Sequence, residues 1–348
     1  MDCKVNNAGS KPFPQTTQLK GAGGHYSRVQ RKRRLYQTGF FLLFILAPVF
    51  DIFRIDLTLG HLILFGQDWT LGLAAWQSGE LSTTQATWNL VWRGLIPLVL
   101  LVAVFGYVSW KYGRLYCGWL CPHFSVVETI NNLMRRASGK FSIWDKTRSD
   151  ELRPDGRYIP TRRSLWPLVW LVAIGFAFLW ALVFLTYLLP PAQVYSHLIS
   201  FNLTRNETIF LTAATIVLSI EFLFARHLFC RFACAVGVFQ SFVWMANKKA
   251  MVVGFDRQRA ADCSTCNAAC EQACPMRLTP RNIKRRMFTC TECAQCLEAC
   301  EQVQAGGPGN SGKLQTPLLQ WVKDECARDT SERDFGIKPN VPTGCYRR

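Results

Sequence analysis

The sequence predicts an α-helical membrane protein with about four transmembrane helices, joined to a small cysteine-rich domain near its C-terminal end. Hydrophobic residues make up 49% of the 348 positions and gather in long runs, and eight of the 15 cysteines lie between positions 263 and 300. The formal net charge of +17 comes from basic residues beside the apolar runs. This is the pattern of the positive-inside rule, so we expect a lipid bilayer as partner and no nucleic acid.

Four apolar segments are candidates to cross a membrane, a task that takes about 20 residues. They are residues 36–53, 94–110, 165–189 and 208–225. The third runs for 25 residues without a charge, whereas Pro48 should kink the first near its outer end. Nine Lys and Arg residues between 135 and 163 predict a cytoplasmic loop. With four helices, both termini and the cysteine-rich domain are then cytoplasmic in a bacterial inner membrane.

These segments define the expected domains. Residues 1–35 should form a disordered basic cytoplasmic tail, and residues 36–246 the transmembrane domain. The cysteine-rich domain should cover 247–302, followed by a linker and tail over 303–348 with one short helix near 318–327. Between the first two helices, residues 55–92 should form an outer segment whose apolar stretches are too short to cross.

The transmembrane region contains an internal repeat. Leu115-Tyr-Cys117-Gly-Trp-Leu-Cys121 matches Leu228-Phe-Cys230-Arg-Phe-Ala-Cys234 at an offset of 113 residues. Each copy follows an inward-running helix and precedes an amphipathic segment, at 124–134 and 236–245. Two hairpins of the same orientation predict a parallel repeat.

The repeated cysteine pairs are candidate redox or metal-binding residues. Cysteines four apart on a helix share one face, and Arg114 and His227 precede the pairs and should favour the thiolate. Soft thiolates suit Cu(I) or a redox-active dithiol, so copper is a candidate ligand. The alternative is that these cysteines are small buried packing residues. The set is Cys117, Cys121, Cys230 and Cys234.

The eight cysteines between positions 263 and 300 form two runs of four. The second run has the bacterial [4Fe–4S] spacing C-x2-C-x2-C-x3-C, and the first has one extra residue before its third cysteine. In such runs the fourth cysteine ligates the other cluster. One cluster is therefore expected on Cys263, Cys266, Cys270 and Cys300, and the other on Cys290, Cys293, Cys296 and Cys274. Zinc ribbons also use paired cysteines but need four ligands per ion, and a disulfide framework needs an oxidising compartment.

Three polar residues near the membrane are further candidates. Glu221 falls inside the last apolar segment, where a carboxylate is a functional hypothesis by default, although it could instead reach towards Arg226. His123 and His227 could add metal ligands or simply lie at the membrane interface.

Together, these motifs resemble the membrane polyferredoxin superfamily over residues 36–302. Its members include the FixG/RdxA/CcoG cytochrome oxidase accessory proteins and the NapH and NosR membrane proteins. Cys230-Arg-Phe-Ala-Cys234 followed by Gln240 and Ser241 is most similar to the FixG/CcoG type. The chain differs from that type at Ala235, which replaces a proline, and no immunoglobulin-like domain follows Cys300.

The resemblance implies oxidoreductase-type electron transfer, most specifically a copper reductase or a maturation factor for a haem–copper oxidase. Partners would be a quinol or cytoplasmic reductant and oxidase assembly proteins. Two alternatives stay open: a quinol-linked relay to a periplasmic reductase, and a non-enzymatic redox sensor or scaffold.

Overall fold

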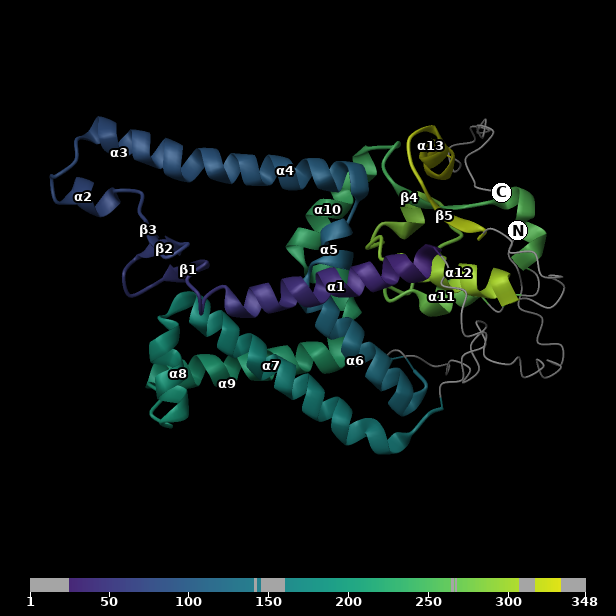
Figure 1. Cartoon of the computed structure of the whole chain (residues 1–348), viewed down its shortest axis with the longest axis horizontal. Coiled ribbons are helices and arrows are strands. Elements are labelled where there is room, and N and C mark those ends of the chain that lie inside the picture. The colour runs from purple at the N-terminus through teal and green to yellow at the C-terminus, as the bar shows by residue number, and fades with distance from the viewer. Residues whose placement is uncertain are drawn as a thin grey trace.

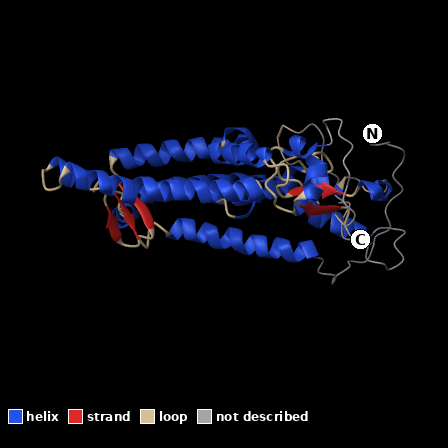
Figure 2. Cartoon of the chain, turned by 90° about the horizontal axis from the view of Figure 1, so that it is seen from above, coloured by secondary structure: helices blue, strands red, loops and turns tan. Residues whose placement is uncertain are grey.

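The computed structural model describes residues 25–140, 143–144, 160–263, 266, 268–306 and 317–332. Four long helices run between the two ends of the molecule: α1 (His25–Leu46), α4 (Ile96–Tyr112), α7 (Trp166–Leu188) and α9 (Arg205–Ile220). Figure 1 shows the cysteine-rich module at one end of these helices. Figure 2 shows that the described strands lie at the two ends, with the helices between them.

Three helical segments in the described part of the chain are long and apolar enough to cross a membrane. They cover Thr83–Tyr112, Arg163–Leu188 and Arg205–Ala225. The second and third match the predicted segments closely. The first begins 11 residues earlier than predicted, because α3 (Thr83–Asn89) and a π-helical stretch (Leu90–Leu95) continue directly into α4.

The first predicted span is different. Helix α1 begins at His25, so residues 25–35 are helical rather than part of a disordered tail, and residues 1–24 lie outside the described part. It ends at Leu46 rather than at residue 53, since Pro48 disfavours helical backbone at the preceding residue. The apolar part of α1 is therefore shorter than the other three spans.

The end opposite the cysteine-rich module is built from short elements. Strands β1 (Phe53–Asp56), β2 (His61–Leu64) and β3 (Gln67–Trp69) form an antiparallel sheet in sequence order. Helices α2 (Leu73–Gln77) and α8 (Pro191–Ile199) lie at the same end (Figure 1). These elements account for much of the outer segment predicted over 55–92.

Each cysteine repeat joins a long helix to an amphipathic one, as the sequence predicts. The first leads from α4 through α5 (Leu115–Trp119) into α6 (Pro122–Ser138). The second leads from α9 through π-helical stretches into α10 (Ala235–Ala246). Helix α7 packs against α6 and α9, with Val169, Ala173 and Ala177 fully buried.

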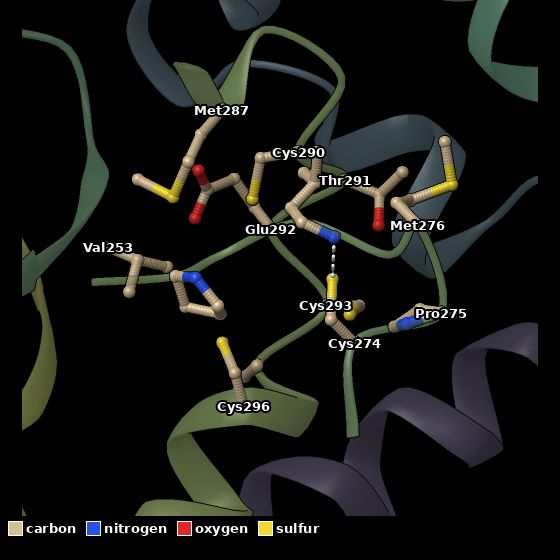
Figure 3. A pocket seen from close by; sticks show the side chains of 13 residues that line it. Val253, Cys274, Pro275, Met276, Met287, Cys290, Thr291, Glu292, Cys293 and Cys296 are labelled. Carbon is tan, nitrogen blue, oxygen red and sulfur yellow. Dashed lines mark hydrogen bonds between the residues drawn. The ribbon is translucent and has the colours of Figure 1, made fainter. Parts of the chain in front are cut away.

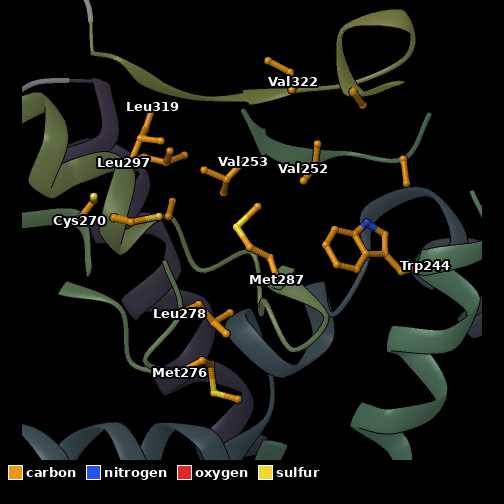
Figure 4. Packing of buried hydrophobic residues seen from close by; sticks show 14 of the residues in the cluster. Trp244, Val252, Val253, Cys270, Met276, Leu278, Met287, Leu297, Leu319 and Val322 are labelled. Atoms are coloured by element: carbon orange, nitrogen blue, oxygen red, sulfur yellow. The ribbon is translucent and has the colours of Figure 1, made fainter. Parts of the chain in front are cut away.

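The cysteine-rich module closes with a strand that the sequence analysis placed in the tail. Strand β4 (Val252–Phe255) pairs antiparallel with β5 (Leu319–Val322), followed by α13 (Glu325–Glu332). The module therefore extends beyond residue 302, and the short helix expected near 318–327 is a strand followed by a helix. Helices α11 (Ala269–Ala273) and α12 (Gln295–Gly306) complete it. Figure 4 shows its core, which includes Val252, Val253, Met287, Leu297, Leu319 and Val322.

Gly237 on α10 gives a direct test of how the two repeats pack. A Cβ at this position would lie 1.9 Å from Nη2 of Arg114 and 2.8 Å from its Cζ. Arg114 is buried, and its Nη2 donates a hydrogen bond to the Cys230 carbonyl oxygen at 2.5 Å. We expect Gly237→Ala to displace this guanidinium and to destabilise the protein by about 1–3 kcal/mol, the usual cost of overpacking.

Thermal unfolding of the detergent-solubilised protein measures this loss. Gly175→Ala on α7 is the matched control, because a Cβ there meets nothing within 4 Å, so it should be neutral or slightly stabilising. Equal loss in both variants would contradict the close packing of Arg114 on Gly237.

Candidate metal centres

Two cavities in the module are each lined by four cysteines. The first cysteine cavity, about 300 Å³ in empty volume, is lined by Cys263, Cys266, Cys270 and Cys300. The second cysteine cavity, about 370 Å³, is lined by Cys274, Cys290, Cys293 and Cys296. Each cavity thus takes its fourth cysteine from the other run, which is the grouping that the crossed ligand pattern predicts.

The rest of the second cysteine cavity is mostly apolar. Val253, Met276, Leu278 and Met287 line it, and Figure 3 shows the cysteine side chains around the same space. Burial raises the pKa of the Cys290 and Cys296 thiols well above the ordinary value. A thiolate is costly in such surroundings unless a cation offsets its charge, so this donor set fits a bound iron centre, which supplies that charge.

The first cysteine cavity has a charged residue in its wall. Arg281 lines it and forms an ion pair with Glu271 at 2.5 Å. The first run has one extra residue before Cys270, yet Cys270 still lines the cavity. Ala268, just before α11, adopts a left-handed conformation with φ of 53° in this part of the run.

The cysteine sets differ from a compact single-ion site. Within the described residues, no three His, Cys, Asp or Glu side chains converge as the ligands of one metal ion. In a [4Fe–4S] cube each thiolate binds its own iron, so the cysteine sulfurs stay apart.

The repeated cysteines lie at a helix break rather than on one helix face, which corrects the sequence-based expectation. Cys117 belongs to α5, but Cys121 is the N-cap residue of α6 because Pro122 follows it. In the second repeat, Cys230 belongs to the π-helical segment Phe229–Ala233 and Cys234 is the N-cap of α10. The two repeats thus share this geometry even though Ala235 replaces the proline.

The structure brings the two pairs together, but burial disfavours the thiolates of Cys121 and Cys117. Burial, with smaller contributions from Cys117 and Cys234, raises the pKa of Cys121 to about 12. Burial also raises the pKa of Cys117, although Arg114 lowers it in part. Cys117 Sγ lies 3.1 Å from Gln240 Oε1, a position in which the thiol donates. Arg114 therefore favours the Cys117 thiolate, as expected, but burial of the thiol has the larger and opposite effect.

Helix α5 lies directly against the second cysteine cavity, a contact that the sequence did not reveal. A Cβ on Gly118 would lie 2.1 Å from the Thr291 carbonyl oxygen. Trp119 Nε1 donates to the Glu292 carbonyl oxygen at 3.0 Å. Because Gly118 follows Cys117, the first cysteine pair adjoins the loop that carries Cys290 and Cys293.

Glu221 pairs with His123. The distance from His123 Nε2 to Glu221 Oε1 is 3.3 Å, and the imidazole packs near the rings of Phe222 and Phe229. Arg226 is fully buried and donates to Asn131 Oδ1 at 3.1 Å. His123 follows the first cysteine pair and Glu221 precedes the second, so the His123–Glu221 pair connects the two repeats.

Comparison with known proteins agrees with an iron–sulfur assignment. A family model described as a 4Fe-4S binding domain matches residues 90–140 and 208–250. An Escherichia coli (strain K12) protein described as an electron transport protein, YccM, is 25% identical over 203 residues. That match covers 58% of this chain and 53% of the relative, so the chain matches about half of that protein's length. No solved structure gives a significant match.

The chain is thus similar to 4Fe-4S binding domains and to one electron transport protein, and it has three helices long and apolar enough to cross a membrane within its described residues. The matched segments are the two cysteine repeats with their helices, whereas the eight clustered cysteines lie outside them.

The crossed grouping of the cysteines predicts how paired substitutions behave. With two clusters, the anaerobically purified protein should contain about eight irons and eight sulfides per chain. Cys274→Ser with Cys293→Ser removes two ligands of one cavity and should leave about four irons. Cys300→Ser with Cys293→Ser removes one ligand from each cavity and should leave almost none. Uncrossed ligation gives the reverse result, so iron and sulfide assays of the two double variants decide between them.

Proposed function

We propose that this protein is a membrane-bound electron carrier whose module holds two [4Fe–4S] clusters and delivers electrons to an acceptor at the repeated cysteines. The clusters, when bound, would supply one-electron redox chemistry. The contact of α5 with the second cysteine cavity carries the proposal, because it places Cys117 one residue from the backbone that touches Thr291.

The residues of the chain have distinct parts in this function. The two cysteine sets hold the clusters, and the apolar walls formed by residues such as Val253 and Met287 exclude water. Gly118 allows the closest approach of α5 to the cluster-bearing loop. Electrons that reach the second cysteine cavity therefore need to cross only this contact to arrive at the first cysteine pair.

We propose Cu(II) as the acceptor, reduced to Cu(I) by one electron for maturation of a haem–copper oxidase. Four soft sulfur donors select Cu(I) over harder ions, and the two cysteine pairs influence each other's pKa. The four side chains would have to move together around the ion, since no three of the described side chains converge on one ion in this conformation. The resemblance to the FixG/CcoG type supports the same acceptor.

The protein would lie in a bacterial inner membrane with both termini and the module in the cytoplasm. The basic residues support this orientation, because they lie at the module's end of the long helices, as Arg33 on α1 and Arg135 on α6 do. The electron donor would then be a cytoplasmic reductant.

Substitution of the repeated cysteines tests copper reduction. We expect Cys121→Ser or Cys234→Ser to keep the iron and sulfide content while lowering the rate of Cu(II) reduction at least tenfold. Substitution of residues that only orient metal ligands typically lowers activity or metal affinity by about 10–100-fold. If the thiols act as a unit, the double variant should be no less active than either single variant.

Copper reduction by the dithionite-reduced protein, followed with a Cu(I)-specific chelator, measures this effect. Full activity in both single variants would refute the role of these thiols. A protein that reduces no copper in its wild-type form would instead be a plain relay or a redox sensor.

A second candidate, a quinol-linked relay to a periplasmic reductase, is favoured by the His123–Glu221 pair. Oxidation of a quinol releases protons together with electrons, so a donor site needs a nearby proton acceptor. The pair lies at the end of the Arg205–Ala225 span. Burial raises the pKa of the nearby Cys230 thiol, and the charge on Glu221 adds to this effect.

For this candidate we expect Glu221→Gln to slow reduction of the protein by quinol in membranes roughly 10²-fold, the usual contribution of a general base. Reduction by dithionite should stay unchanged. Glu207→Gln is the matched control, because Glu207 pairs with His197 at 3.1 Å at the opposite end of the same helix. If the wild-type protein is not reduced by quinol, this candidate is wrong.

A further inference from the structure

Arg33 is a buried cation on α1 that binds α5 and α6 close to the second cysteine cavity. Its side chain on α1 is 1% exposed, although the sequence places it in a run of four basic residues. Its Nε donates to the Gly118 carbonyl oxygen at 2.7 Å, and its Nη2 forms an ion pair with Glu128 of α6 at 2.5 Å. A buried guanidinium held on both sides in this way has a fixed position.

The same residues reach the cluster-bearing loop through two amides. Arg33 Nη1 donates to Gln30 Oε1 at 3.2 Å, and Gln30 Nε2 donates to the Cys293 carbonyl oxygen at 2.6 Å. On the other side, Gln295 at the start of α12 donates to Glu128 Oε1. The cation and the carboxylate are therefore each one hydrogen-bonded amide away from the residues around the second cysteine cavity.

Both charges lie close to the loop of the ligand Cys293, because Gln30 binds the Cys293 carbonyl oxygen and Gln295 binds Glu128. Charges that lie so close to a ligand interact strongly with it, because the surrounding protein screens them less than water does.

The two cysteine cavities differ in where their charged neighbours come from. Arg281 and Glu271, beside the first cavity, both belong to the module itself. The second cavity has the module's Glu292 in its wall, and it also has Arg33 and Glu128 nearby, which come from α1 and α6. Helices α1 and α6 can therefore act on one cluster without acting on the other.

We propose that the Arg33–Glu128 ion pair sets the reduction potential of the cluster in the second cysteine cavity, separately from the first. Reduction adds one negative charge to a cluster, so a nearby cation raises its potential and a nearby carboxylate lowers it. Arg33 and Glu128 are positioning residues with opposite effects. The inference rests on the proposed function in one respect, namely that this cavity holds a cluster.

The experiment is a redox titration of the full-length, detergent-solubilised protein, in which paramagnetic resonance resolves the signals of the two reduced clusters. We expect Arg33→Gln to lower the potential of the second cluster and Glu128→Gln to raise it. Each shift should reach about a tenfold change in the reduced-to-oxidised ratio, which is about 59 mV for one electron. Arg33→Lys keeps the charge and should shift the potential less than Arg33→Gln does.

The first cluster is the internal control, and its potential should not move in these variants. Arg281→Gln is the matched variant and should lower the potential of the first cluster alone. The opposite signs are decisive, because a merely structural role would make both substitutions loosen the same contact and shift the potential in one direction. Shifts of equal sign, or no shift, would overturn the proposal.

Iron and sulfide assays separate this inference from the proposed function. If Arg33→Gln does not fold, Glu128→Gln alone decides, since a raised potential supports the proposal and an unchanged one overturns it. Full cluster content with unchanged potentials overturns only this inference. A wild-type protein without clusters overturns both.

Discussion

The position of the cysteine-rich module depends on the contact between Gly118 and the Thr291 carbonyl oxygen. There is no room for a Cβ at this point, since it would come within 2.1 Å of that oxygen. Trp119 and Gln30 hold the same loop from either side through the backbone oxygens of Glu292 and Cys293. The loop that carries Cys290 and Cys293 is thus held by residues of α1 and α5.

Buried charges hold together the elements around this interface. Arg33, Arg114 and Lys284 are each at most 2% exposed. Every one of them binds a backbone oxygen of another element, and Lys284 Nζ donates to the Trp244 and Asn247 carbonyl oxygens at 2.9 and 2.6 Å. Burial lowers the pKa of Lys284 to about 8. A buried charge without its partner is strongly destabilising, so Lys284 favours contact between the module and the end of α10.

The features that the sequence predicted have local signals. The apolar runs that become α7 and α9 are long enough to identify by composition, and the cysteine spacings predict the grouping around two cavities. Strand β5 was missed because four residues beyond a glycine-rich stretch give no local signal, and only pairing with β4 makes them a strand. Arg33 was placed in a disordered tail because a basic run is normally solvated. Its partners Gly118 and Glu128 are more than 80 positions away.

The segments shared with the 4Fe-4S family model lie on the membrane side of this interface. Residues 90–140 contain Gly118 and Glu128, and residues 208–250 contain Gly237, on which Arg114 packs. The eight cysteines around the two cavities lie outside both segments. A surface that receives the cysteine-rich module needs a missing Cβ at Gly118 and the carboxylate of Glu128. The matched segments therefore contain residues that contact the module.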